Sequence, residues 1–159
     1  MVVEVVFEER YWYPDDGGEV WLAGYTPVDA TGRYLGRDAP ELAARGLRVA
    51  TVAGAGRHHA EALASDAAAP GRPLTLRRDA GNPHDANAIA VDGAGAEQLG
   101  WVPRELAAEL AGELDAGRPW AAVALREQRR SPRDPRSGLT MLLAPGDRIE
   151  LSPRARREP

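Results

Sequence analysis

The fold is decided by residues 76–104, which read LRRDAGNPHDANAIAVDGAGAEQLGWVPR. Alternating apolar and polar residues open this stretch and an apolar run follows at residues 88–92, so the pattern predicts two strands. The Gly-rich residues 92–95 predict a hairpin that leads into a third strand at residues 98–102. The polar loop 82–87 (NPHDAN) offers a carboxylate, an imidazole and two amides. That mixture suits a nucleic-acid end or another small polar ligand better than a packed core.

A helix is predicted directly after this stretch. Pro103 suits the first helical position, where its missing N–H costs nothing. Leu106, Leu110 and Leu114 then repeat every four residues and form one apolar stripe, and Gly117 ends the helix. The sequence therefore predicts one amphipathic helix that packs against the strands.

Short elements are also predicted on both sides. Further strands are expected at residues 2–7, 19–23, 47–53, 74–78, 120–125, 139–143 and 147–151, and short helices at residues 38–46 and 59–67. Many short strands with few short helices favour a mainly β fold with some α (α+β). We expect a small OB-like or SH3-like antiparallel β-barrel with two or three short helices packed outside it.

The composition excludes several classes of function. The 159 residues suffice for one domain with a hydrophobic core, and 43% of them are hydrophobic. The chain has no cysteine, which excludes disulfides, thiol nucleophiles and Cys-ligated zinc. No signal peptide and no apolar run long enough for a bilayer is visible, so we expect a soluble cytoplasmic protein that does not contact a membrane.

Charge is unevenly distributed along the chain. All 20 basic residues are arginine, and the net charge is −4. Residues 1–45 carry 4 arginines against 9 acidic residues, whereas residues 118–159 carry 10 against 5. Arginine binds phosphate through paired N–H donors. An acidic protein lacks the basic surface of a tight duplex binder, so any nucleic-acid binding should be local, modest and sensitive to salt.

The order of the motifs resembles the HIRAN family. The segments that carry the resemblance are Val52-Ala53-Gly54, Leu76-Arg77-Arg78, residues 82–91 (NPHDANAIAV), residues 98–104 (QLGWVPR) and the helix that follows. The resemblance covers about residues 47–127, with residues 139–151 as a closing strand pair. It implies a small β-barrel related to the OB fold. In eukaryotic fork-remodelling helicases, this domain binds the free 3′ end of single-stranded DNA.

The resemblance also implies roles for individual residues. Asp85 stands where the family has the aspartate that receives the terminal 3′-hydroxyl, and His84 replaces a tyrosine. Trp101 and Arg104 fall in the second stretch that lines the groove. After the first strand, the end-binding proteins have an arginine with adjacent tyrosines, and this chain has Arg57 and His58 there. The candidate nucleic-acid-binding residues are Arg57, His58, Asn82, His84, Asp85, Trp101 and Arg104.

From this resemblance and the composition, we expect the chain to divide into three segments. Residues 1–46 form an acidic N-terminal extension of strands and a short helix. Residues 47–151 form the HIRAN-like barrel, with a mobile loop at residues 128–138. Residues 152–159 form a disordered tail.

The same residues also permit other roles and other functions. Asn82 and Asp85 also suit a role in capping a turn through local amides. The first functional hypothesis is a non-enzymatic module for single-stranded DNA ends in repair or replication, with a helicase, nuclease or other repair protein as partner. The second is a protein-interaction module on the same barrel, in which the acidic N-terminal region holds another protein. The third is a metal-dependent hydrolase built on His58, His59 and His84.

We assign no catalytic residue, no metal ligand and no cofactor. A loop that follows phosphates is a further hypothesis for the arginines at positions 126, 129, 130, 133 and 136, beside a role as an ordinary solvated loop.

Overall fold

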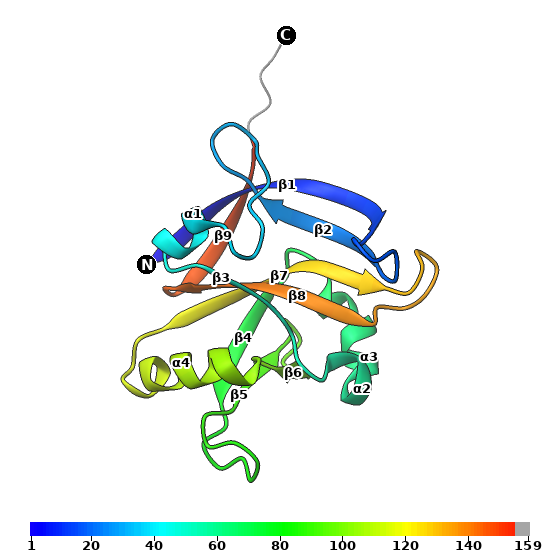
Figure 1. Cartoon of the computed structure of the whole chain (residues 1–159). Coiled ribbons are helices and arrows are strands. Elements are labelled where there is room, and N and C mark those ends of the chain that lie inside the picture. The colour runs from blue at the N-terminus through cyan, green and yellow to red at the C-terminus, as the bar shows by residue number, and fades with distance from the viewer. Residues whose placement is uncertain (155–159) are drawn as a thin grey trace.

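A computed structural model of the chain describes residues 1–154, and strands dominate it (Figure 1). The strands are β1 (Val2–Pro14), β2 (Trp21–Pro27), β3 (Arg48–Thr51), β4 (Pro73–Arg78), β5 (Ile89–Asp92), β6 (Gln98–Trp101), β7 (Trp120–Arg129), β8 (Gly138–Pro145) and β9 (Arg148–Pro153). The helices are α1 (Pro40–Ala44), α2 (Ala55–His58), α3 (Ala60–Ala64), the 3-10 turn η1 (Asp66–Ala68) and α4 (Arg104–Asp115). Among residues 1–154, no helix has the length and apolar character needed to cross a bilayer.

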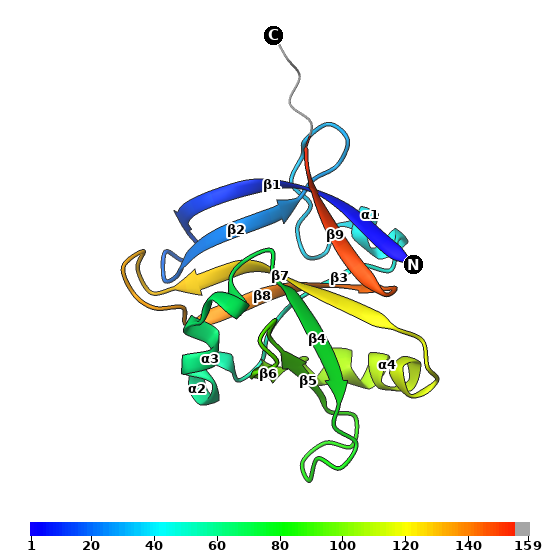
Figure 2. The same ribbon diagram turned by 180° about the vertical axis from the view of Figure 1, so that it is seen from behind.

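The nine strands of residues 1–154 form one branched sheet around β7. β8 pairs along one side of β7, and β3 pairs with the outer edge of β8. On its other side, β7 pairs with β4 near its beginning and with β2 near its end. One branch then continues from β4 to β5 and β6, and the other from β2 to β1 and β9. Figures 1 and 2 show the two branches above and below β7 and β8.

The prediction of a mainly β fold with short helices is confirmed, but the sheet is not a closed antiparallel barrel. β1 and β9 are parallel, because both run outward from the turn near Asp147. β6 approaches the end of β3 only through one isolated bridge, in which Ala53 and Trp101 exchange backbone hydrogen bonds of 2.8 and 2.9 Å. A single bridge stands where a closed barrel would need a continuous ladder.

Two hydrophobic cores lie on opposite faces of β3, β7 and β8. The first contains residues of α3, β4–β6 and α4, including Leu63, Ile89, Leu99, Leu110 and Met141. The second joins residues of the N-terminal region to Leu125 and Leu142, and it includes Val5, Leu35 and Leu42. Residues 1–46 therefore cover one face of the central strands.

The predicted helix after Pro103 is confirmed, but Pro103 is its N-cap, with extended backbone, and not its first helical residue. Leu110 is buried in the first core, and Leu106 and Leu114 pack against it. The single helix expected at residues 59–67 is wrong, because three short turns begin at Ala55. Gly54 starts the first turn at φ +75°, and His59, at φ −134°, separates α2 from α3.

Two of the expected segment boundaries also differ. The loop between β7 and β8 is shorter than residues 128–138, because β7 continues through Arg129 and β8 begins at Gly138. Ser152 and Pro153 were expected in the tail but complete β9, which pairs with β1. Residues 155–159 of the expected tail lie outside the described residues. The division at residue 46 stays an interpretation.

Gly100 provides a test of the bridge that holds β6 beside β3. A Cβ at Gly100 would lie 2.4 Å from the Ala53 carbonyl oxygen and 2.7 Å from Val52 Cγ1. We expect Gly100→Ala to lower the free energy of unfolding by about 1–3 kcal/mol in urea titrations, because the added methyl forces the two segments apart. Gly112 on the exposed face of α4 is the matched control, since its Cβ would meet nothing within 4 Å. Gly112→Ala should stabilise the protein by about 0.5–1 kcal/mol, and equal effects of both changes would refute the role of the bridge.

Candidate nucleic-acid interface

The loop between β4 and β5 is held by hydrogen bonds between the Asn82 side chain and other groups of the same loop. Asn82 Oδ1 accepts hydrogen bonds from the backbone N–H groups of His84 (2.8 Å) and Asp85 (3.1 Å). The amide nitrogen of Asn82 donates to Asp79 Oδ2 at 3.1 Å. The turn-capping role that the sequence left open for Asn82 is therefore present. It fixes the direction in which the next residues point.

Asp85 uses its two carboxylate oxygens differently. Oδ1 accepts a 2.9 Å hydrogen bond from the backbone N–H of Asn87, which is a local capping contact. Oδ2 lies 3.8 Å from Arg104 Nε, beyond hydrogen-bond distance, and within residues 1–154 it accepts no hydrogen bond. The Asp85 side chain is 21% exposed and that of Arg104 is 81% exposed. One oxygen thus holds the loop, and the other remains available to a ligand.

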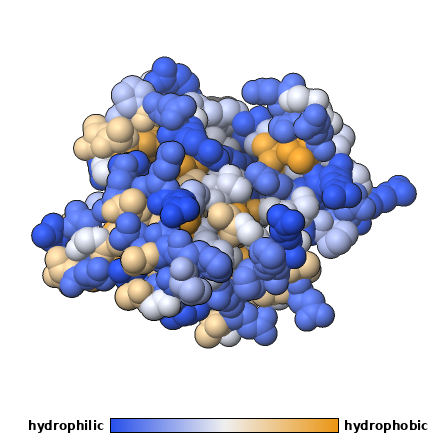
Figure 3. Space-filling view, turned by 60° about the horizontal axis from the view of Figure 1, so that its bottom comes forward, coloured by the Kyte–Doolittle hydropathy of each residue, from blue (hydrophilic) through white to orange (hydrophobic). Residues whose placement is uncertain are grey.

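Asp85 borders a hollow of about 290 Å³. Polar and aromatic side chains line it together with apolar residues, most of which are buried. The lining residues are Asn82, His84, Asp85, Trp101 and Arg104, together with Ala53, Ala88, Ile89 and Val102. The bridge between Ala53 and Trp101 places the β6 tryptophan opposite the loop. Figure 3 views the molecule from the end that lies at the bottom of Figure 1. The surface there is mostly hydrophilic, with small, separate apolar patches.

Arg57 and His58 line a different, neighbouring hollow of about 670 Å³. The two hollows adjoin at Gly54, where a Cβ would lie 3.7 Å from both His58 Cδ2 and Trp101 Cδ1. Five of the seven candidate residues thus share one hollow, and the other two border the next. A ligand that contacts all seven would have to pass over Gly54.

Thr51 and Arg130 also line the second hollow, and the sequence did not single them out as a pair. Arg130 belongs to the arginine-rich loop, and the arginines of this loop differ in their contacts. Arg129 and Arg136 are bound to the buried Glu127. Those two guanidinium groups are therefore committed to the fold, whereas Arg130 is exposed beside the hollow.

Within residues 1–154, the histidines are not grouped in the way that the metal hypothesis requires. The rings of His58 and His59 have centroids 6.5 Å apart and lie on α2 and at its end. Across residues 1–154, no group of three or more His, Asp or Glu residues is placed to hold an ion. The hydrolase hypothesis loses the arrangement on which it depended.

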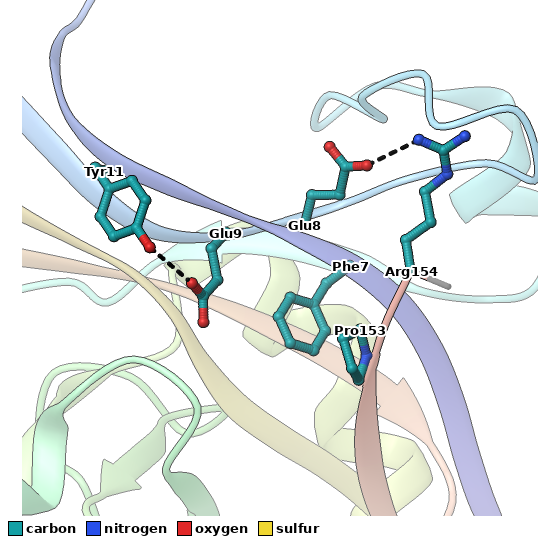
Figure 4. A pocket seen from close by; sticks show the side chains of 6 residues that line it. All are labelled: Phe7, Glu8, Glu9, Tyr11, Pro153 and Arg154. Atoms are coloured by element: carbon teal, nitrogen blue, oxygen red, sulfur yellow. Dashed lines mark hydrogen bonds and ion pairs between the residues drawn. The ribbon is translucent and has the colours of Figure 1, made fainter. Parts of the chain in front are cut away.

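A further hollow lies on the opposite branch of the sheet, where β1 passes β9 (Figure 4). Glu8 pairs with Arg154 at 3.0 Å, and Tyr11 donates a 3.2 Å hydrogen bond to Glu9. Phe7 and Pro153 complete the lining. Two carboxylates here disfavour a phosphate, so this hollow is distinct from the nucleic-acid interface.

The two adjoining hollows, lined by Asp85, Trp101 and Arg104 on one side of Gly54 and by Arg57 and Arg130 on the other, form one groove. The fold and this groove define a small, mainly β binding domain. The chain belongs to the HIRAN domain family, whose model matches residues 47–132, more than half of its length. Domains of this family are nucleic-acid-binding modules rather than catalysts. No curated protein sequence matches the chain.

Two solved structures are similar to the chain. One is a protein from Lactobacillus plantarum, 24% identical, with a TM-score of 0.50 over 60% of this chain and 87% of that one. The other is the HIRAN domain of human HLTF, 23% identical, with a TM-score of 0.45 over 62% of this chain and 76% of that one. Because the Lactobacillus plantarum protein is only 24% identical to this chain, their similarity concerns the fold alone.

Proposed function

We propose that this protein binds the free 3′ end of single-stranded DNA in repair or replication in the cytoplasm. The observation that carries the proposal is that Oδ2 of Asp85 accepts no hydrogen bond within residues 1–154, while Asp85 lines a hollow together with Trp101 and Arg104. The three side chains offer an acceptor, an aromatic face and a cation. A DNA end presents a hydroxyl, a base and a phosphate to match them.

The carboxylate supplies the specificity for the end. An ionised carboxylate accepts a hydrogen bond from a hydroxyl but repels a phosphate. Asp85 would therefore favour a terminal 3′-hydroxyl over a 3′-phosphate or over an uninterrupted strand. The loop amides that hold Asn82 and Asp85 keep this acceptor in place before the ligand arrives.

Trp101 and the arginines would supply affinity. A base stacked on an aromatic side chain contributes about 1–3 kcal/mol without regard to sequence. Arg104 is largely exposed and only loosely paired with Asp85, so it can turn to a phosphate without breaking a short contact. Arg57 and His58 lie on the other side of Gly54, where the preceding nucleotides would pass.

We further propose that a helicase, nuclease or other repair protein acts on the bound end. A second candidate function, capture of a basic protein segment by residues 1–46, is favoured by the acidic hollow of β1. That function predicts that Glu9→Gln weakens capture of a partner while DNA binding is unchanged.

Trp101 tests the proposed function. We expect Trp101→Ala to weaken binding of a fluorescent single strand by about 5- to 150-fold, which corresponds to the loss of one stacked base. Trp101→Phe should retain most of the affinity, because it keeps an aromatic face. Fluorescence anisotropy measures both, and urea titration shows whether each variant is folded. Affinities of Trp101→Ala equal to those of the unchanged protein would contradict the assignment of the groove.

A further inference from the structure

Three arginines outside the candidate groove converge between the N-terminal layer and the central strands. Arg10 lies on β1, Arg37 lies between β2 and α1, and Arg126 lies on β7. Arg10 and Arg37 precede the residues that match the family, so the family resemblance says nothing about them. Strand pairing places Arg10 and Arg126 on either side of Gly24 of β2, which pairs with both, and this proximity comes from the fold alone.

The pairing of the strands sets this arrangement. Thr51 of β3 lies opposite Thr140 of β8, and Thr140 lies opposite Arg126 of β7. Arg37 reaches this row and donates a 3.2 Å hydrogen bond to the Thr51 hydroxyl. Arg126 donates a 3.2 Å hydrogen bond to the backbone carbonyl of Tyr25.

Arg10 is oriented by aromatic rings. Its guanidinium carbon lies 3.9 Å from the ring centre of Tyr13 and 4.7 Å from that of Tyr34. Such stacking holds a guanidinium without consuming its N–H donors. Those donors therefore remain available to an anion.

Within residues 1–154, none of these three arginines forms an ion pair with a carboxylate. Ten other arginines do: Arg33, Arg48, Arg77, Arg78, Arg104, Arg118, Arg129, Arg136, Arg148 and Arg154. Burial lowers the pKa of the Arg126 guanidinium, and the positive charges of Arg10 and Arg37 lower it further, against an opposing effect of Tyr13. Positive charges that repel one another without a carboxylate to balance them favour a bound anion.

The cluster also adjoins the candidate interface. Thr51, which holds Arg37, lines the same hollow as Arg57 and Arg130. This hollow in turn meets the Asp85 hollow at Gly54. Basic side chains thus continue from the proposed end-binding groove onto the N-terminal layer.

We propose that Arg10, Arg37 and Arg126 form a phosphate-binding site for the backbone of the single strand whose 3′ end lies at Asp85. The inference rests on the proposed function and adds to it a role for the N-terminal region. The strand would run from Asp85 past Gly54 and Thr51 to the three arginines. A short strand would not reach this site, whereas a longer one would.

The test compares single strands of about 4 and about 16 nucleotides, the range of site sizes for related folds. We expect Arg37→Gln to weaken binding of the longer strand several-fold and to reduce the slope of log affinity against log salt by about 0.7, which is the loss of one phosphate contact. Binding of the short strand should not change. Arg48→Gln is the control, because Arg48 lies on β3 near Thr51 but already pairs with Glu109.

The outcomes separate the two proposals. An unchanged affinity and salt slope for Arg37→Gln on the longer strand, with Trp101→Ala still weakening both strands, would overturn the phosphate site and leave end binding intact. Equal losses on both strand lengths would also overturn it, because the effect would then not depend on reach. Failure of the unchanged protein to bind either strand would overturn the proposed function and the phosphate site together. Arg10→Gln should repeat the length dependence, and thermal unfolding checks that both variants remain folded.

Discussion

Glu127→Gln is expected to lower the free energy of unfolding by about 3–5 kcal/mol, the usual cost of leaving one member of a buried ion pair without its partner. The Glu127 side chain is 8% exposed and contacts the guanidinium groups of Arg129 and Arg136. Arg136, which is 11% exposed, also donates to the carbonyls of Leu63 and Ser65. Its charge would remain buried after Glu127 loses its own.

Urea titration measures this effect. Glu113→Gln is the matched control, because Glu113 pairs with Arg118 on the surface, and such pairs contribute less than about 1 kcal/mol. If both changes cost the same, Glu127 does not anchor the hairpin of β7 and β8. Because Arg136 ties this hairpin to α3, the loss should also loosen the region of Arg57 and His58, which hydrogen exchange would detect.

Asp85→Asn is expected to reduce the preference for a 3′-hydroxyl over a 3′-phosphate by about tenfold or more. Asparagine keeps an oxygen that can accept the hydrogen bond from Asn87, so the loop should stay folded. The amide carries no charge, and the repulsion of a terminal phosphate disappears. Two like charges about 4 Å apart near a protein surface repel by several kcal/mol, which exceeds the 1.4 kcal/mol needed for a tenfold change.

Most of the change should come from tighter binding of the 3′-phosphate strand, measured by anisotropy at constant salt. Asp79→Asn is the control, because Asp79 lies in the same loop and accepts a hydrogen bond from Asn82 but does not line the hollow. A loss of preference in both variants would mean that the charge of the loop, and not Asp85, sets the selectivity.

The sequence predicts the parts of the groove that depend on local order. The NPHDAN loop, the hairpin and the helix after Pro103 are contiguous, and their turn residues and apolar spacing determine them. Five of the candidate residues accordingly share one hollow. Arg57 and His58 lie beyond it, because Gly54 begins a turn at positive φ that no spacing rule places.

Other features depend on tertiary pairing. β7 continues to Arg129 through a bulge near Ala124, so Glu127 is buried in a segment whose charge is typical of a loop. The parallel pairing of β9 with β1 joins segments that are far apart in the sequence. The same long-range pairing places Arg10 and Arg126 on either side of Gly24, and Arg37 reaches the neighbouring strands through Thr51. No window of the sequence contains those partners together.

If the Asp85 groove recognises a free 3′ end, the protein should distinguish single strands by how they end. Fluorescence anisotropy at low and moderate salt would measure the affinity of the protein for single strands that end in a 3′-hydroxyl, that end in a 3′-phosphate, or that are closed into a circle. We expect clearly tighter binding of the 3′-hydroxyl strand at both salt concentrations. Equal affinities for all three strands would contradict it and would leave only a general attraction between arginines and phosphates.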